Sequence, residues 1–371
     1  MNERPLRRGW TTGTCATAAA KAAYAALLTG EFPDPIEVTL PRGERVAFAL
    51  AMTRNENDSA AAGVVKDAGD DPDVTHGALI VASVRKSAPG SGVTFRAGEG
   101  VGTVTLAGLP IPPGQPAINP MPRQMIRNAI AEVAAAYGGS GDVEVEIAVP
   151  GGAELATRTL NARLGIVGGL SILGTTGIVI PYSCSAWIHS IHRGVDVARA
   201  AGLTHVAAAT GSASEAAIKQ FHDLPDMALL DMGDFVGGTL KYLRRHPVPR
   251  ITIAGGIAKI TKLGQGLLDL HSKRGAVDRV ALAMLAENSG GSAALRERIL
   301  AANTTAEAFR FAAEENLRLG DAMAQQAWRT AAAVLAGTES ALEVVVFDRD
   351  GKLVGHAPFA RPHDAFPRNR L

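Results

Sequence analysis

His205-Val-Ala-Ala-Ala-Thr-Gly-Ser-Ala-Ser214 is the stretch that decides the fold, because it joins an apolar run, a glycine-bearing turn and a helical pattern over residues 215–221. The same order recurs twice downstream. It is found in Met227-Ala-Leu-Leu-Asp-Met-Gly-Asp234 before residues 235–243, and in Arg250-Ile-Thr-Ile-Ala-Gly-Gly-Ile-Ala-Lys259 before residues 260–270. Short apolar runs that enter helices through tight turns are typical of a parallel α/β sheet.

The three turns form a candidate ligand site. Ligands of such sheets bind beyond the carboxyl ends of the strands, where these turns lie. Glycine lets the backbone approach a ligand closely, and helix N-termini offer free N–H groups to anions. Any one of these glycines has a plain turn as an equally good explanation, but three such turns in succession favour a small-molecule site. The candidate residues are Thr210, Gly211, Gly233, Asp234, Gly255 and Gly256.

Length predicts two domains, and composition argues against duplex nucleic acid as a partner. A chain of 371 residues with 47% apolar residues exceeds one ordinary core. We expect a mixed α+β domain over residues 1–155 and a Rossmann-like α/β domain with a parallel sheet over residues 156–371. A formal net charge of +1 argues against duplex nucleic acid as a partner. Cys15 and Cys184 form no CxxC pair, which excludes a thiolate zinc site and fits a reducing, cytoplasmic location.

Periodicity predicts further elements on both sides of these turns. Thr14 is the expected N-cap of an Ala-rich helix over residues 15–28. In residues 164–188 there is no charge over a length that could span a membrane, but the glycines and Pro181 favour buried strands and turns there. The other expected elements are a hairpin (36–40 with 45–52), strands at 78–86, 93–96, 103–106, 142–149 and 342–348, a helix at 120–137, and helices from 279 to 337, with a loose tail after Ala357.

The densest polar cluster is Lys66-Asp-Ala-Gly-Asp-Asp-Pro-Asp-Val-Thr-His76. Closely spaced carboxylates on a loop suit a hard cation such as Mg²⁺ or Ca²⁺, although the spacing is not that of an EF-hand. The same aspartates also suit recognition of amide or amine groups. An acidic surface turn is the third interpretation, and a turn alone does not need Lys66 or His76.

Two further segments offer polar groups to a ligand. Prolines fix a rigid loop before a helix N-terminus at residue 120, where Asn119 and Arg123 are placed to hold a carboxylate. Hydroxyl groups occur in Thr11-Thr-Gly-Thr14 and again in Gly174-Thr-Thr-Gly177, next to bare backbone. The candidate substrate-binding residues are Thr12, Thr14, Lys66, Asn119, Arg123, Thr175 and Thr176.

Several of these segments resemble the CbiD family of cobalamin biosynthesis over residues 9–278. The resemblance is carried by Trp10-Thr-Thr-Gly-Thr-Cys-Ala-Thr-Ala-Ala-Ala-Lys21, Val65-Lys-Asp-Ala-Gly-Asp-Asp-Pro-Asp-Val-Thr-His-Gly77, Gly100-Val-Gly-Thr-Val-Thr105, Pro116-Ala-Ile-Asn-Pro-Met-Pro-Arg123 and Gly168-Gly-Leu-Ser-Ile-Leu-Gly-Thr-Thr-Gly177.

The resemblance implies an enzyme of the anaerobic cobalamin pathway. Such an enzyme transfers a methyl group from S-adenosylmethionine to ring carbon C-1 of cobalt-precorrin-5B and gives cobalt-precorrin-6A. The resemblance also implies a corrinoid site in the first domain and an S-adenosylmethionine site at the glycine turns of the second. It further implies that Asp67, Asp70, Asp71 or His76 steers protons during the reaction. Cobalt arrives within the substrate, so no protein metal site is expected. A membrane partner is not expected, and the sequence leaves a homodimer open.

The alternative from another class is a Mg²⁺-dependent phosphoryl-transfer or hydrolytic enzyme that acts on a small carboxylated metabolite. It would use the aspartates of residues 67–73 for the metal and the glycine turns for phosphate. A Walker-type lysine loop would favour it, and the sequence contains none.

Overall fold

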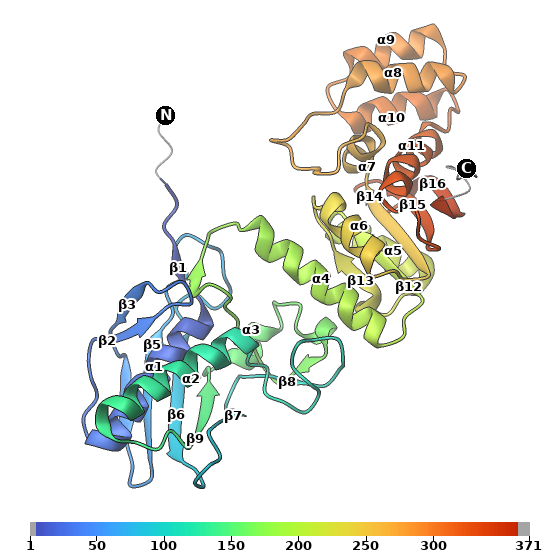
Figure 1. Cartoon of the computed structure of the whole chain (residues 1–371). Coiled ribbons are helices and arrows are strands. Elements are labelled where there is room, and N and C mark those ends of the chain that lie inside the picture. Colours follow the sequence, from blue (N-terminus) through green and yellow to red (C-terminus); the bar gives the residue numbers. More distant parts are fainter. Residues whose placement is uncertain (1–4, 363–371) are drawn as a thin grey trace, which may run out of the picture. The chain divides into compact units, whose positions relative to one another are not determined.

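The computed structural model describes residues 5–362, which fall into two compact units. The first extends to Ser183 and the second begins at Cys184 (Figure 1). Residues 156–183, which we expected in the second domain, pair with strands of the first unit instead. Within them, β10 (Ile166–Val167) pairs with β8 (Thr103–Val104), and β11 (Ile178–Val179) pairs with β1 (Gly9–Trp10).

The first unit is a mixed five-stranded sheet covered by two helices. The strand order is β4 (Met52–Asn55), β5 (Ser59–Val65), β6 (Leu79–Lys86), β9 (Val143–Ala148) and β7 (Val93–Ala97). Every neighbouring pair is antiparallel except β7 with β9. A separate hairpin joins β2 (Ile36–Thr39) to β3 (Arg45–Phe48), as the sequence predicts. The short helices α3 (Gly152–Ala156) and η1 (Ala162–Leu164) lead into β10.

Small side chains let the long helix of this unit lie close to the sheet. Helix α1 (Thr12–Thr29) is buried on nearly all sides, against β5, β6 and α2 (Pro120–Tyr137). Ala60 and Ala62 of β5 belong to the same core as the alanines of α1. An alanine-rich strand has low intrinsic β-propensity, so periodicity did not reveal β5.

The second unit contains the expected parallel sheet. The strand order is β13 (Leu229–Asp231), β12 (His205–Ala209), β14 (Arg250–Gly256), β15 (Ala341–Phe347) and β16 (Leu353–Ala360). The first four strands are parallel and β16 is antiparallel to β15. We expected a loose tail after Ala357, but β16 continues to Ala360, so this expectation is wrong for residues 358–360. Residues 363–371 of the expected tail lie outside the described residues.

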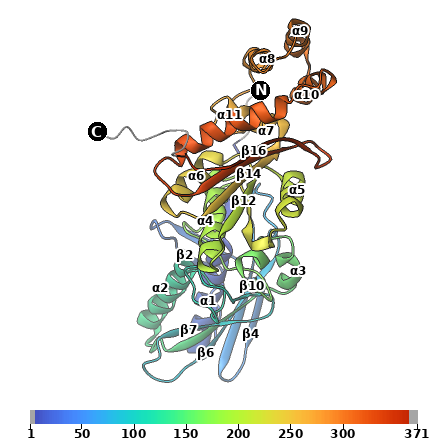
Figure 2. The same cartoon turned by 90° about the vertical axis from the view of Figure 1, so that its right-hand side faces the viewer.

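Helices cover both faces of this sheet, as Figure 2 shows for α5 on one side and α6 on the other. Ile218 of α5 packs with Ala207 and Val345 on the first face, and Leu240 of α6 packs with Val206 on the second. The helices of the unit, with the 3-10 turn η2 (Asp226–Ala228), are α4 (Cys184–Ala200), α5 (Ser212–His222), α6 (Val236–Arg245), α7 (Ile257–Gly264), α8 (Arg279–Asn288), α9 (Ala293–Ala301), α10 (Thr305–Glu314) and α11 (Leu319–Val334).

The chain between residues 164 and 188 forms β10, β11, turns and the first residues of α4. The expected strands and turns are present, but the strands are only partly buried, and residues 184–188 are helical. Among residues 5–362, no helix has both the length and the apolar character that a membrane crossing needs.

Candidate functional site

Four motif segments that lie far apart in the sequence meet at the N-terminal ends of α1 and α2. The amide of Gly13 donates to Leu173 O at 2.8 Å, and the amide of Asn119 donates to Ile172 O at 3.0 Å. The amide of Trp10 donates to Asp67 O at 2.7 Å. The α1 start, the 66–77 loop, the proline loop and the 168–177 loop therefore form one region, which we call the motif cluster.

The two helix N-termini of the motif cluster adjoin each other. A Cβ added to Gly13 would lie 2.6 Å from Pro122 Cγ, so only glycine allows α1 to begin this close to α2. A Cβ at Gly174 would lie 2.3 Å from Thr11 Oγ1, and the φ of Gly174 is +150°. Two adjacent positive helix ends, with a bare backbone loop beside them, form a favourable place for carboxylates.

The predicted threonines divide into structural and accessible ones. Helix α1 begins earlier than expected, at Thr12, and its N-cap is Thr11 and not Thr14. Thr14 is fully buried, and its hydroxyl donates to Gly177 O at 2.8 Å. Thr12 is also buried, whereas Thr175 is exposed. Thr176 bonds the backbone of Ile178. Thr175 is thus the predicted hydroxyl best placed to meet a ligand.

Asn119 and Arg123 sit at the start of α2, as expected. Arg123 donates from Nε to Ile118 O at 2.8 Å and from Nη2 to Pro116 O at 3.0 Å. It thereby rigidifies the proline loop, and burial lowers the pKa of its guanidinium. Asn119 is the N-cap of α2, yet within the described chain its side chain makes no capping bond. Pro120 and Pro122 have no N–H, so Met121 supplies the free N–H of the first turn of α2. This N–H and the side-chain amide of Asn119 remain for a ligand.

Lys66 is buried beneath the 66–77 loop, where its side chain is 1% exposed. Its ammonium is paired with Asp73 and donates to Thr75 Oγ1 at 2.6 Å. Burial acts to raise the pKa of Asp73, but Lys66 and the bonds from Thr75 outweigh it and hold this pKa below its usual range. In this structure Lys66 shapes the loop from within.

The other aspartates of the 66–77 loop also accept hydrogen bonds from backbone amides and so hold the loop in place. Asp67 pairs with the Arg7 guanidinium, which together with the Gly69 amide lowers the pKa of Asp67 to about 2. Asp71 accepts from the Tyr182 amide at 2.9 Å. Asp70 accepts from the Arg7 amide at 2.6 Å and remains exposed. Asp67 is therefore a persistent anion and a weak base, whereas Asp70 is open to a substrate.

His76 is the titratable ring of the motif cluster, and its side chain is 53% exposed. Its Nδ1 accepts the Ala68 amide proton at 3.1 Å. An Nδ1 that accepts a hydrogen bond places the proton of the neutral ring on Nε2. His76 therefore presents an N–H donor outward in its neutral form.

Large apolar side chains are exposed on the segments of the motif cluster and on the chain next to them. Leu173 and Met121 lie on the 168–177 loop and the first turn of α2, and are 52% and 37% exposed. Val65 precedes Lys66, and Ile180 and Tyr182 follow β11. Exposed apolar residues beside a polar constellation indicate a binding surface for a large, partly apolar ligand.

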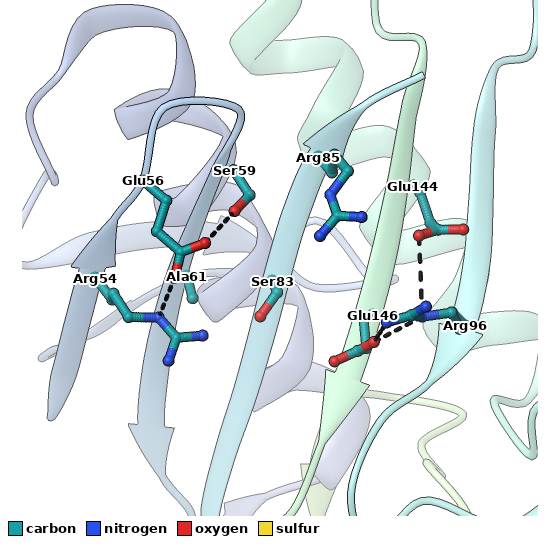
Figure 3. A pocket seen from close by; sticks show the side chains of 9 residues that line it. All are labelled: Arg54, Glu56, Ser59, Ala61, Ser83, Arg85, Arg96, Glu144 and Glu146. Carbon is teal, nitrogen blue, oxygen red and sulfur yellow. Dashed lines mark hydrogen bonds and ion pairs between the residues drawn. The ribbon is translucent and has the colours of Figure 1, made fainter. Parts of the chain in front are cut away.

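A shallow depression elsewhere on the first unit lacks these features (Figure 3). It lies on the sheet face that carries Ala61, whereas Ala60 and Ala62 point into the core with α1. Its charged side chains pair with each other, as Arg96 does with Glu146 and Arg54 with Glu56. Charged side chains that pair with each other are typical of a sheet face that contacts solvent.

In the second unit, the candidate residues all follow the carboxyl ends of parallel strands. Thr210 and Gly211 follow β12, Gly233 and Asp234 follow β13, and Gly255 and Gly256 end β14. A Cβ at Gly255 would lie 2.8 Å from Ile260 Cδ1 and from Thr210 Oγ1, so close packing requires this glycine. At Gly211 and Gly256 an added Cβ would meet no atom of the described chain within 4 Å, which leaves space for a ligand.

The helices that follow these strands have no side-chain caps at their N-termini. Within residues 5–362, no N-cap side chain bonds the start of α5, α6 or α7. By contrast, Asp278, Ser292 and Thr304 cap α8, α9 and α10. In the first turn of α6, the amide of Gly237 donates to Leu268 O at 2.8 Å. Unpaired N–H groups therefore gather at the starts of α5 and α7, at the edge of the sheet where the glycine turns lie.

Two side chains at this edge of the sheet were not predicted as site residues from the sequence. Lys259 of α7 forms an ion pair with Asp234, which joins the second and third turns. Trp187 of α4 donates to Asp231 O at 2.9 Å and lies beside Gly233, with 46% of its surface exposed. Neither partner is near in the sequence. Lys262 of the same helix is buried, and its ammonium donates to Leu270 O at 3.1 Å.

Comparison with known proteins gives consistent results for the whole chain. A CbiD family model matches residues 1–181, and a CbiD C-terminal domain model matches residues 269–358. The chain is 61% identical to the cobalt-precorrin-5B C(1)-methyltransferase of Bradyrhizobium sp. over 99% of this chain and 97% of that protein. It is also 61% identical to the protein of the same name from Agrobacterium fabrum, over 98% and 96%.

One solved structure is also similar, that of a cobalamin biosynthesis protein (cbiD) from Archaeoglobus fulgidus. It is 28% identical, and the alignment covers 72% of this chain and 83% of that chain with a TM-score of 0.40.

Proposed function

This chain belongs to the CbiD family, and from this premise we propose that it methylates cobalt-precorrin-5B at ring carbon C-1 to give cobalt-precorrin-6A. The observation that carries the proposal is the motif cluster, where four segments characteristic of the family come together in space. We propose S-adenosylmethionine as the methyl donor. The absence of a disulfide among residues 5–362 supports a reducing cytoplasm as its location.

We assign the corrinoid to the motif cluster of the first unit, within the predicted domain of residues 1–155 and the adjoining loop to residue 177. A corrinoid has an apolar macrocycle edged with acetate and propionate carboxylates. The N-termini of α1 and α2, Asn119 and Thr175 suit the carboxylates. The exposed Leu173, Met121 and Tyr182 suit the macrocycle.

We assign S-adenosylmethionine to the carboxyl edge of the parallel sheet in the second unit, in a Rossmann-like arrangement. The open N-termini of α5 and α7 suit the carboxylate and ribose hydroxyls of the cofactor. The open space at Gly211 and Gly256 lets the backbone approach it. When bound, the cofactor supplies a methyl group that its sulfonium has already activated.

The chain's own residues then have mainly a positioning role. An activated methyl group needs alignment with the ring carbon and exclusion of water more than it needs a strong base. Among the predicted catalytic residues, Asp70 and His76 have the most exposed side chains, so we propose these two for direct contact with the substrate. Asp67 and Asp71 hold the loop through Arg7 and Tyr182.

Calorimetric titration with S-adenosylhomocysteine, compared with ATP–Mg²⁺, tests this assignment. We expect S-adenosylhomocysteine to bind and ATP–Mg²⁺ not to bind. Gly211→Val should weaken the binding while the melting temperature is kept, because the first added carbon enters open space. Binding of ATP–Mg²⁺ alone would contradict methyl transfer and favour a Mg²⁺-dependent phosphoryl-transfer enzyme.

A further inference from the structure

Three histidines and one glutamate converge on the sheet of the second unit, away from the glycine turns. His205 is the first residue of β12, His222 ends α5, and His356 lies on β16. All three surround Glu343 of β15, whose side chain is 3% exposed. His205 is at the N-terminal end of β12, whereas Thr210 of the proposed cofactor site follows its C-terminal end. The cluster and the proposed cofactor site therefore lie toward opposite ends of the parallel strands.

The carboxylate of Glu343 is the centre of this cluster. His222 Nε2 lies 2.6 Å from Glu343 Oε2, and the Thr252 hydroxyl donates to the same oxygen at 2.7 Å. His356 Nε2 lies 2.8 Å from Oε1, and His205 Nε2 lies 2.8 Å from Thr252 Oγ1. Three histidines, from two strands and one helix, are therefore linked to a single buried carboxylate through one or two hydrogen bonds each.

The donor atoms lie close enough for one metal ion. One ligand atom each from His205, His222 and Glu343 falls within 4.8 Å of the others. Around a tetrahedral zinc ion with bonds of about 2.0–2.2 Å, ligand atoms are separated by roughly 3–4 Å. Small side-chain rotations therefore suffice to bring all three onto one ion, with the Thr252 hydroxyl turned aside.

The surroundings also fit a metal ion with nitrogen and oxygen ligands. The rings of His205 and His222 meet edge to face at 4.8 Å, so they do not stack against each other. Phe359 lies 5.3 Å from His205 and 5.8 Å from His222, which provides an apolar wall. The side chain of His222 is 19% exposed, which gives an ion a route inward from solvent.

We propose that His205, His222 and Glu343 bind one divalent transition-metal ion of the zinc class, and that His356 holds Glu343 through its other oxygen. Two imidazoles and a carboxylate are a ligand set that proteins use for zinc, and hydrogen bonds to a ligating carboxylate tune such sites. The ion ties the end of α5 to β12 and β15, so its role is to stabilise the second unit. This differs from the expectation that the protein needs no metal site, and it does not depend on methyl transfer.

Zinc titration of the chelator-stripped, tag-free full chain tests this site, in competition with a chromophoric chelator. We expect one equivalent of zinc per chain and a melting temperature that rises with zinc. His222→Gln should weaken binding at least about 100-fold, and His356→Gln about 10–100-fold, as loss of an outer hydrogen bond to a ligand does. The matched control is His271→Gln, an exposed histidine of the same unit, which should leave binding unchanged.

Cobalt(II) provides a second measurement that needs no variant. Binding at His205, His222 and Glu343 should give visible absorption bands of a low-coordinate site, which an equivalent of zinc removes. The proposal is overturned if the wild-type protein binds no zinc saturably or gives no such bands. It is equally overturned if His222→Gln and His271→Gln bind zinc alike, because the four side chains would then form only a hydrogen-bond network.

Discussion

Replacing Lys66 with methionine tests whether this residue shapes the 66–77 loop from within. Methionine retains the apolar stem and removes the ammonium, so Asp73 loses its buried partner. Removing one partner of a fully buried ion pair costs about 3–5 kcal/mol. Asp73 is 26% exposed and keeps two bonds from Thr75, so water and these bonds compensate part of the loss. We expect the free energy of unfolding to fall by about 2–4 kcal/mol.

The assay is urea denaturation followed by circular dichroism, with hydrogen exchange of the 66–77 peptide to localise the effect. Lys21→Met is the matched control, because Lys21 pairs in the same unit with Glu132, whose side chain is 47% exposed. This control should cost about 0–1 kcal/mol. Adding Asp73→Asn to Lys66→Met should restore part of the stability, since the uncompensated charge is gone.

The reasoning about Lys66 is refuted if Lys66→Met costs no more than Lys21→Met. It is also refuted if the exchange of the 66–77 peptide is unchanged while corrinoid binding is lost, because Lys66 would then act as a direct ligand of the substrate.

Three further predictions concern the remaining residues. Gly255→Ala should destabilise the second unit by about 1–3 kcal/mol, because its Cβ would press on Thr210 and Ile260, whereas Gly256→Ala should leave the urea midpoint unchanged; equal effects would contradict the packing described here. Burial raises the pKa of Cys15 to about 12, so a thiol reagent should modify the exposed Cys184 alone in the native protein and Cys15 only after unfolding; two rapidly reacting thiols in the native protein would speak against this. The pairing of Asp67 with Arg7 depresses the pKa of Asp67 to about 2, so it stabilises the protein above the unfolded pKa of about 4, and this stabilisation is lost as pH falls toward 2. The difference in unfolding free energy between wild type and Asp67→Asn should therefore shrink over this range. A difference that grows as pH falls would contradict the stabilising role of the ionised carboxylate.

Local sequence patterns predicted the strand–turn–helix units of the second unit, because each is a contiguous run of apolar residues followed by a glycine turn. They placed α2 correctly, since Pro120 marks its first turn and Gly138 ends it with a φ of +75°. Strand β5 was missed because alanines carry no strand signal of their own. Strand β16 was missed because Pro358 argues against a strand, although an edge strand tolerates proline.

Long-range partners could not be predicted from local patterns. Thr14 was predicted as a helix N-cap and a substrate-binding residue, but its hydroxyl donates to Gly177 O, 163 residues away. Lys66 looked like a cation for substrate, but folding buries it beneath its own loop. The partners of Lys259 and His222 are likewise distant in the sequence. The positions of the candidate residues followed from motifs, whereas which side chains remain open to a ligand depends on tertiary contacts.

The most direct test of the proposed function is a single incubation of the purified protein with cobalt-precorrin-5B and S-adenosylmethionine labelled with ¹³C in its methyl group. We predict one labelled methyl group per corrinoid, located at C-1 by NMR, with S-adenosylhomocysteine formed in equal amount and no loss of activity in the presence of a metal chelator. A corrinoid recovered without label, or labelled at another ring carbon, would contradict the function proposed for this chain.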